Sequence, residues 1–342
     1  MSTRLRDKII ARIRERGPLP FDEFMETALY DSDDGFFAGA SPARPEGHFV
    51  TSPHLSPVFE GLLAAQARDA WHTMERPDPF VVVDLGAGEG ALARGIATAA
   101  TSDEAFARAL RVVAVERGEI AAKHLASSGL TVATSLADLE PLTGVVFANE
   151  LFDNVPFSLF AGDEEIMVTE EGDRLIWQSR EWRSLRPVSK RSGEIVDQVG
   201  RTLARGYVLI FDYGFSGNEE PETVRGYRGH RLVEELLDDP GSSDITGPVD
   251  FDALAARARS NGLQVWGPVS QRDALMALGY RATLDRMRAD QQQREQGGAW
   301  RGAIEVYAER GQAAMLVDPA GLGALKVLAL GTKGLPAPRA LS

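Results

Sequence analysis

A short β-branched run that ends in a glycine-rich turn constrains the fold more than any other part of this chain. The run at 79–85 reads PFVVVDL, the turn at 86–90 reads GAGEG, and ALARGIATAA at 91–100 has a helix-forming composition. Glycines permit a tight turn and allow a ligand to approach the backbone. The sequence therefore predicts a strand, a tight loop and a helix that open an α/β nucleotide-binding core.

The same alternation of short β runs and helical stretches continues along the chain. Further β runs stand at 111–116, 131–135, 144–150, 207–214, 263–268 and 326–331. Strands that alternate with helices at this spacing predict a Rossmann-like parallel sheet with helices on both faces.

The pattern divides the chain into five parts. Residues 1–78 read as an N-terminal helical and lid segment, and 79–156 as the first part of the core. Charged, hairpin-like pieces at 157–205 replace an expected helix and predict an inserted substrate or partner region. Residues 206–334 complete the core, and 335–342 have no periodicity, which predicts a loose tail.

Composition excludes several classes of partner and site. The formal net charge of −13 is spread along the chain, so we expect no nucleic-acid footprint and a preference for cationic partners such as a basic protein segment. The chain has no cysteine, and its five histidines form no HExxH pair, so we expect no metal site.

No apolar run approaches the roughly 18 residues that span a bilayer, so we expect no membrane partner. The arginine-rich start has helical spacing of its apolar residues, which favours a cytoplasmic protein over a targeting peptide.

Charge decides which nucleotide the glycine turn suits. A dinucleotide loop follows GxGxxG and holds a pyrophosphate, whereas this loop is GxGxG with Asp84 before it and Glu89 inside it. Two carboxylates would repel a pyrophosphate but stabilise the sulfonium and ammonium groups of S-adenosylmethionine. Glu116 closes the next strand, where a carboxylate accepts both ribose hydroxyls. The expected contacts of the donor S-adenosylmethionine are Asp84, Gly86, Gly88, Gly90 and Glu116; a structural turn without a ligand is the alternative.

Two residues after the third β run suit an adenine ring. Leu136 offers an apolar surface and Asp138 a carboxylate, although Asp138 has an almost equal claim as a turn or helix cap.

Polar residues at later strand ends predict the site of the methyl acceptor. Ligands of open α/β folds bind at the carboxyl ends of the strands, and paired carboxylates suit a guanidinium acceptor. The candidate catalytic residues are Asn149, Glu150, Asp153 and Asp212, and the first two could instead cap the next helix. His54 and His230 are candidate bases for a hydroxyl acceptor.

Six ordered stretches resemble one family, the MidA-like and NDUFAF-seven-type S-adenosylmethionine-dependent methyltransferases. The stretches lie at 11–37, 47–64, 148–157, 209–214, 225–254 and 316–331; ANELFDNVPF, for example, resembles the family's ANEFFDALPV. The mitochondrial member of the family is a complex I assembly factor that methylates a protein arginine. The resemblance implies a class I methyltransferase fold and a homodimer. It also implies donor contacts at the loop glycines and Glu116, substrate roles for Asn149, Glu150 and Asp153, and a lid of Thr51, Ser52 and Pro53 over the donor.

The sequence departs from the family pattern at two places. The loop at 84–90 reads DLGAGEG where the family has an ELGPGRG type of loop, and His48 and His54 replace an expected aspartate and glutamate. Three functions remain open at this point. The chain is a protein methyltransferase with arginine as the leading acceptor, a small-molecule O- or N-methyltransferase, or a donor-binding assembly factor with little or no catalysis.

Overall fold

The computed structural model describes residues 3–38, 51–178, 185–229 and 231–342, and a seven-stranded sheet lies at the centre of this part of the chain. In spatial order its strands are β16 (Gln264–Ser270), β17 (Lys326–Gly331), β10 (Leu203–Asp212), β5 (Leu142–Asn149), β2 (Phe80–Leu85), β3 (Leu110–Val115) and β4 (Thr131–Ala133). The strands from β10 to β4 pair in parallel, whereas β17 runs antiparallel to both β10 and β16. The predicted α/β sheet is confirmed, with β17 as the exception to its parallel order.

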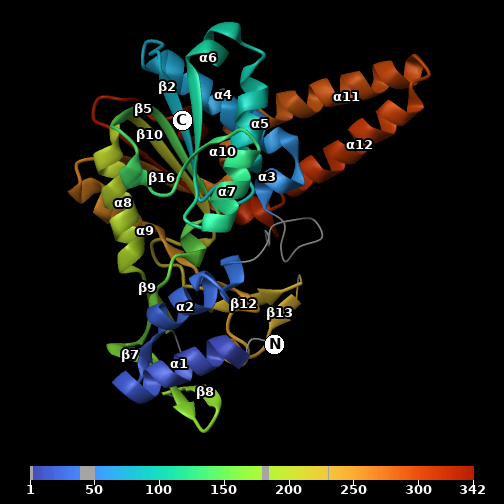
Figure 1. Ribbon diagram of the computed structural model, residues 1–342. Coiled ribbons are helices and arrows are strands. Elements are labelled where there is room, and N and C mark those ends of the chain that lie inside the picture. The colour runs from blue at the N-terminus through green and yellow to red at the C-terminus, as the bar shows by residue number, and fades with distance from the viewer. Residues whose placement is uncertain (1–2, 39–50, 179–184, 230) are drawn as a thin grey trace.

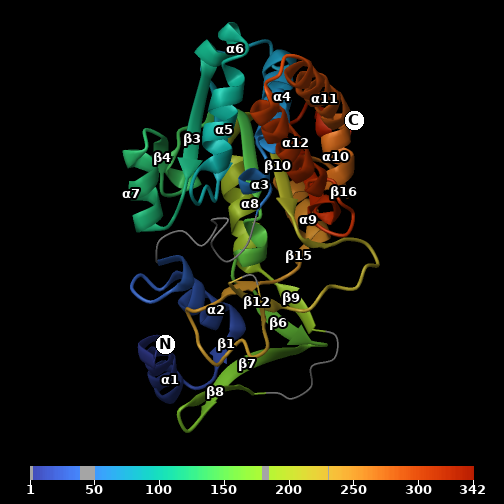
Figure 2. The same cartoon turned by 90° about the vertical axis from the view of Figure 1, so that its right-hand side faces the viewer.

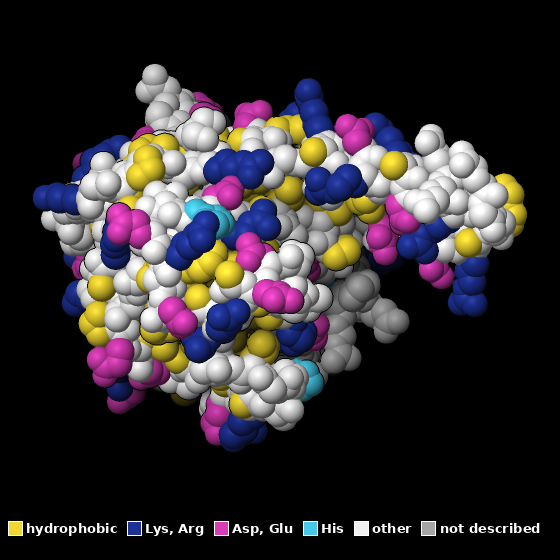
Figure 3. Space-filling view, turned by 90° about the horizontal axis from the view of Figure 1, so that it is seen from above, with side chains coloured by type: hydrophobic (Ala, Val, Ile, Leu, Met, Phe, Trp, Pro, Cys, Tyr) yellow, Lys and Arg dark blue, Asp and Glu magenta, His cyan; other side chains and the backbone are white. Residues whose placement is uncertain are grey.

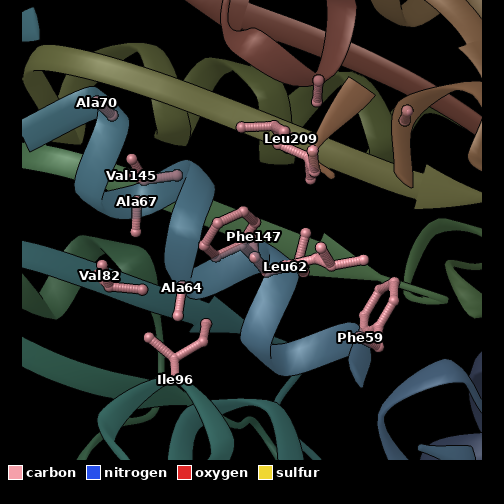
Figure 4. Packing of buried hydrophobic residues seen from close by; sticks show 14 of the residues in the cluster. Phe59, Leu62, Ala64, Ala67, Ala70, Val82, Ile96, Val145, Phe147 and Leu209 are labelled. Carbon is pink, nitrogen blue, oxygen red and sulfur yellow. The ribbon is translucent and has the colours of Figure 1, made fainter. Parts of the chain in front are cut away.

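Helices cover one face of this sheet through a large hydrophobic core. Figure 4 shows Leu62 of α4 (Pro57–Thr73) beside Phe147 of the sheet, and the Phe59 ring of the same helix packs edge-on against the Phe211 ring of β10. The same face carries α3 (Ser52–Leu55), α5 (Ala91–Ala100), α6 (Glu104–Ala109) and α10 (Gln271–Ala277). Because residues of β2 and β5 are buried from both sides, these strands are runs of apolar residues without polar alternation.

A second core fills the opposite face. Val196 and Val199 of α8 (Lys190–Thr202) and Leu254 of α9 (Phe251–Ser260) pack with Val208 of β10 in one buried cluster. A smaller cluster joins α7 (Glu119–Ser127) to the β3 edge of the sheet. Helices therefore lie on both faces, as expected.

A smaller lobe lies beyond one end of the sheet, where segments far apart in sequence meet (Figures 1 and 2). Its helices are α1 (Thr3–Arg16) and α2 (Phe21–Tyr30). One of its sheets contains β1 (Leu19–Pro20), β6 (Ser158–Ala161), β7 (Glu164–Glu171), β8 (Arg174–Trp177) and β9 (Leu185–Val188). The other contains β12 (Arg225–Arg228), β13 (Arg231–Val233) and β14 (Asp244–Thr246), and the pair β11 (Gly214–Phe215) with β15 (Val249–Asp250) leads toward it. Phe21, Phe24 and Phe157 lie in the core of this lobe.

An antiparallel helical hairpin of α11 (Tyr280–Gln296) and α12 (Trp300–Met315) projects from the side of the molecule (Figure 1). Seen from above, the surface carries Lys and Arg interspersed with Asp and Glu, and hydrophobic side chains show on the projecting hairpin (Figure 3). Within the described residues, no helix is both long enough and apolar enough to cross a membrane.

Two expected boundaries differ from the structure. The segment 157–205 supplies β6 to β9 of the small lobe, but it ends in α8 and the start of β10, which belong to the core. The prediction of a loose tail at 335–342 is wrong. The Tyr207 hydroxyl donates to the carbonyl of Pro336, the Ala340 N–H donates to Gln66 Oε1, and Ala340 is buried. These contacts hold the C-terminal residues against β10 and α4 of the core.

Candidate active site

A cavity of about 890 Å³ opens at the carboxyl ends of β2, β3 and β5. From β2 the chain adds β3 and β4 on one side of the sheet and then crosses to add β5 on the other side of β2, so the strand order reverses between β2 and β5. Ligands of open α/β sheets bind at such a reversal. The cavity also reaches Tyr30 and Phe37 of the small lobe, so it lies between the two parts of the molecule.

Different structural reasons favour glycine at the three loop positions. All three have a positive φ, at 78° for Gly86, 51° for Gly88 and 74° for Gly90, which favours glycine over other residues. A Cβ at Gly86 would lie 2.7 Å from Leu151 Cδ1, and one at Gly90 would lie 2.6 Å from Leu125 Cδ2. At Gly88 a Cβ would meet no atom of the described residues within 4 Å, and this residue lines the cavity. Gly88 is therefore the position at which a ligand can approach the backbone.

Two carboxylates fix the shape of the loop. The Ala93 N–H donates to Asp84 Oδ2 at 3.0 Å, and burial raises the pKa of Asp84 to about 7. Glu116 accepts from the Gly88 N–H at 2.9 Å with Oε2 and from the Gly118 N–H at 2.8 Å with Oε1. Burial also raises the pKa of Glu116. Each Glu116 oxygen keeps a second lone pair that a ribose hydroxyl could reach.

Of the two residues that were predicted to contact adenine, Leu136 lines the cavity and Asp138 does not. Leu136 is buried and lines the cavity, as an apolar wall for the ring requires. Asp138 instead caps the short 3₁₀ turn at Leu136–Asp138, accepting from Ser135 N–H at 2.9 Å and from the Thr134 hydroxyl at 2.8 Å. Because it is not among the residues that line the cavity, its local capping role replaces the expected adenine contact.

The lid residues connect the donor loop to the acceptor side. Thr51 and Pro53 line the cavity. Ser52 is fully buried and does not line it, and its N–H donates to Glu150 Oε1 at 3.2 Å. The Thr51 hydroxyl lies 2.8 Å from His54 Nδ1, and His54 Nε2 lies 3.4 Å from Glu89 Oε2. Burial lowers the pKa of His54 despite the nearby Glu89. The short helix α3 thus touches both ends of the cavity.

The contact between His54 and Glu89 joins two departures from the family pattern. Glu89 stands where the family pattern has arginine, and His54 stands where it has glutamate. In this chain the acidic member of the pair, Glu89, lies on the loop, and its histidine partner lies on the lid. His48 lies outside the described residues.

Replacing His54 with alanine is expected to weaken binding of S-adenosylhomocysteine about fivefold, because the lid loses its contact with the donor loop. Calorimetric titration measures this, with His124→Ala as the control, since His124 is exposed on α7. Equal affinity in the His54 variant and the wild type would show that this contact does not hold the lid.

Glu150 has the features of a general base. It follows β5 with a φ of +48°, a strained value for a residue other than glycine. Its Oε1 accepts from Ser52 N–H and, at 3.1 Å, from Asn149 Nδ2. Burial, followed by the nearby Asp153, raises the pKa of Glu150 to about 7. A carboxylate with this pKa accepts a proton efficiently near neutral pH.

Asn149 supplies a second acceptor beside Glu150. Its amide donates to Glu150, while its Oδ1 is buried without a hydrogen-bond partner. Both residues line the cavity. A buried acceptor without a partner costs stability, so a ligand N–H is the natural partner of this oxygen.

The other two predicted catalytic carboxylates do not line the cavity. Asp212 is fully buried, and its Oδ2 accepts from the N–H groups of Leu151, Phe152 and Asp153 at 3.1, 2.7 and 3.4 Å. Asp212 therefore shapes the turn after β5, and the prediction that it acts on the substrate is wrong. Asp153 is also buried. His230 lies outside the described residues.

Sequence reasoning missed a group that closes the cavity between the lobes. The Arg117 guanidinium lies 4.0 Å from the centre of the Tyr30 ring and 2.7 Å from Glu26. Arg191 of α8 pairs with the same Glu26, and the Tyr30 hydroxyl donates to the Asn154 carbonyl. The available signal was the position of Arg117 directly after Glu116, at the end of β3. Its partner is 91 residues away, so the pairing itself is not visible in the sequence.

The chemistry of the site fits a cationic donor better than an anionic one. Asp84, Glu89 and Glu116 line the cavity around the open position at Gly88. Carboxylates at these places stabilise a sulfonium and an ammonium group and bind ribose hydroxyls. Among the described residues, no group of three or more acidic or histidine side chains could hold a metal ion.

Known proteins resemble this chain in sequence and in fold. A family described as S-adenosyl-L-methionine-dependent methyltransferase matches residues 62–269. "Protein arginine methyltransferase NDUFAF7 homolog, mitochondrial" of Drosophila melanogaster is 27% identical, over 93% of this chain and 82% of its own length. "Protein arginine methyltransferase NDUFAF7, mitochondrial" of Mus musculus is 27% identical, over 79% and 73%. In fold, a COG1565 superfamily member from Burkholderia thailandensis, solved with S-adenosyl-homocysteine, matches with a TM-score of 0.84 at 24% identity, over 99% of this chain and 94% of its own.

Proposed function

The chain belongs to the family of S-adenosyl-L-methionine-dependent methyltransferases, and from that premise we propose that it methylates an arginine side chain of a protein. The observation that carries this proposal is the pair of acceptors at the end of β5. Glu150 presents a half-buried carboxyl, and Asn149 Oδ1 has no hydrogen-bond partner. A planar guanidinium presents two N–H groups side by side, which match two neighbouring acceptors.

The residues around the acceptor pair suit the chemistry of methyl transfer. S-adenosylmethionine, when bound, supplies an electrophilic methyl group on its sulfonium. The acceptor nitrogen forms a bond to that carbon while the bond from sulfur to carbon breaks, and the nitrogen gives up a proton. Glu150 accepts this proton, and Asn149 orients the guanidinium so that one nitrogen faces the methyl group. The Ser52 N–H, which donates to Glu150, holds the base in place.

Two further observations support a protein acceptor. The formal net charge of −13 favours a basic segment over an acidic one. The curated relatives from fly and mouse carry the name protein arginine methyltransferase, each at 27% identity. The homodimer implied by the resemblance stays a prediction.

Incubation with S-adenosylmethionine labelled in its methyl group tests the acceptor class. The purified protein is added to an extract of cells that lack its gene, and protein is separated from small molecules. We expect the label to precipitate with protein. Label that stays in the small-molecule fraction would favour a small-molecule methyltransferase, and no transfer at all would favour an assembly factor. Either of these results contradicts the proposal.

The rate of methyl transfer is expected to rise with pH through about 7, because Glu150 must be ionised to accept a proton and burial raises its pKa to about 7. Measurement of kcat between pH 5.5 and 9 at saturating donor checks this. A rate that falls over the same range would show that a protonated group, rather than the Glu150 carboxylate, is required.

A further inference from the structure

A series of hydrogen bonds leads from Glu150 away from the cavity and into the core. Glu150 Oε1 accepts from the Ser52 N–H at 3.2 Å. The Ser52 hydroxyl lies 3.3 Å from Gln271 Nε2 and 3.4 Å from Gln271 Oε1. Gln271 Nε2 also donates to the Leu316 carbonyl at 2.9 Å. The series therefore joins the end of β5 to α3, to α10 and to the residue that follows α12.

Burial makes the middle of this series depend on its own partners. Ser52, Gln271 and Leu316 are all 0% exposed, so solvent does not replace a lost hydrogen bond there. The Leu316 carbonyl can only accept, which fixes the Gln271 amide with its nitrogen toward Leu316. Gln271 Oε1 can then accept from the Ser52 hydroxyl.

Gln271 has a fixed position in the core. Its backbone N–H donates to the Leu325 carbonyl at 2.6 Å, and Ser270 caps the helix that Gln271 begins. The end of α12 is held against the same region, because the Tyr280 hydroxyl donates to the Ala313 carbonyl at 2.9 Å. The Gln271 amide therefore lies between two well-held parts of the structure.

The helix α3 is less secure by itself. It has four residues, and a single helical turn is not stable without contacts to the rest of a protein. On the donor side, His54 Nε2 lies 3.4 Å from Glu89 Oε2. On the acceptor side, the Ser52 hydroxyl meets Gln271. The position of the Ser52 N–H thus depends on the contact with Gln271.

We propose that Gln271 is a positioning residue for methyl transfer, which holds Ser52 so that the Ser52 N–H keeps Glu150 directed at the acceptor. This inference rests on the proposed function, because it takes Glu150 as the base. Gln271 does not line the cavity and contacts neither donor nor acceptor. Since Ser52 contacts Gln271 with its hydroxyl and Glu150 with its N–H, a change at Gln271 reaches the base through one residue.

Two substitutions remove the contact from its two sides. Gln271→Met replaces the amide with an apolar group on a side chain of similar length, and Ser52→Ala removes the hydroxyl but keeps the N–H. Each variant is expected to lower kcat about three- to tenfold at pH 7, the effect of one hydrogen bond. The double variant should lose no more than Gln271→Met alone, because the two residues act through one contact.

Tyr280→Phe is the matched control. It also removes a buried hydrogen bond to the end of α12, but it leaves Gln271 and Ser52 unchanged. We expect a lower Tm, as for Gln271→Met, with kcat within about twofold of the wild type.

Ionisation of Glu150 shows whether the Ser52 N–H has moved, and it needs no acceptor. Burial, followed by Asp153, raises the pKa of Glu150 to about 7, and the Ser52 N–H lowers it. Loss of that N–H therefore raises the pKa further. The infrared C=O stretch of protonated Glu150, identified by its absence in Glu150→Gln, follows the titration. We expect its midpoint at higher pH in Gln271→Met and in Ser52→Ala, by about half a pH unit.

The rise of kcat with pH should move in the same direction, while Tyr280→Phe keeps both midpoints of the wild type. No variant replaces another titratable group around Glu150 or on the elements packed against it; these groups are Asp153, Asp212, Tyr213, Asp244 and His54. Binding of S-adenosylhomocysteine should stay within about twofold of the wild type, because His54 and Glu89 keep their contact on the donor side.

Three results would overturn the proposal. Additive losses of kcat in the double variant would mean that Gln271 and Ser52 act separately. A lower Tm with an unchanged Glu150 midpoint would mean that Gln271 only supports the end of α12. Weaker binding of S-adenosylhomocysteine with unchanged kcat would mean that the contact holds the lid over the donor instead.

If Gln271→Met does not fold, the Glu150 midpoint in Ser52→Ala decides the question by itself. An unchanged midpoint in that variant contradicts the proposal, and a midpoint at higher pH supports it. The infrared comparison uses no acceptor, so it is unaffected if the methyl group goes to a small molecule. Failure of the arginine proposal and failure of this inference can therefore be told apart.

Discussion

Replacement of Glu150 with glutamine is expected to lower kcat for methyl transfer by about 10²- to 10⁴-fold, the usual contribution of a general base. Glutamine keeps the size of the side chain, and its Oε1 can still accept from Ser52 N–H. It cannot accept the proton that the acceptor nitrogen loses. Binding of S-adenosylhomocysteine should stay close to that of the wild type, because the donor contacts lie on the glycine loop and Glu116. Initial rates and calorimetric titration of the same preparation measure both quantities.

Glu119→Gln provides a matched control for this substitution. Glu119 also lines the cavity but is exposed at the start of α7, where it pairs with Lys123. Its replacement should change kcat by less than about twofold, since exposed ion pairs contribute little. If Glu150→Gln retained full activity at saturating substrate, Glu150 would not be the base.

Replacement of Gly88 with valine is expected to weaken binding of S-adenosylhomocysteine by about 100-fold or more, equivalent to about 3 kcal/mol. The φ of +51° is unfavourable for a β-branched residue, and the Cβ of the added side chain would have no atom of the described part of the chain within 4 Å. The side chain therefore competes with the ligand for space. Calorimetric titration with S-adenosylhomocysteine, and with NAD to test the rejected dinucleotide alternative, measures this effect.

Gly162→Val separates backbone strain from loss of the ligand site. Gly162 lies in the turn between β6 and β7 with a φ of +62°, and a Cβ there would also meet no atom within 4 Å among the residues that the structure describes. This variant should lose a similar amount of stability and bind S-adenosylhomocysteine normally. If both variants lost binding equally, strain would explain the effect, and the placement of the donor at Gly88 would be wrong.

Local sequence signals were sufficient for the core of the fold and for the donor loop. The run at 80–85 is β-branched, and Gly86, Gly88 and Gly90 follow it at the positions where the backbone has a positive φ. These signals lie within a dozen residues, so no long-range contact was needed to recognise them. The antiparallel direction of β17, by contrast, has no local signal in the sequence. It depends on the path of the chain through α11 and α12, which periodicity does not specify.

Neighbouring strand ends show why the catalytic carboxylate could not be chosen from the sequence. Asn149 of β5 pairs with Phe211 of β10. The next residues along the chain, Glu150 and Asp212, therefore come at the same height of the sheet. Glu150 faces the cavity, whereas Asp212 turns to the backbone N–H groups after β5. Burial and hydrogen-bond partners decide such roles, and both come from tertiary structure. For the same reason the contact of His54 with Glu89, 35 residues apart, was not expected.

The most direct test of the account is mass spectrometry of the methylated product. The purified protein is incubated with S-adenosylmethionine that carries a deuterated methyl group and with an extract of cells that lack its gene. We expect deuterated methyl groups on arginine nitrogens of at least one protein, and none when Glu150→Gln replaces the wild type. Transfer of the label to other residue types or to small molecules, with no labelled arginine, would contradict the account.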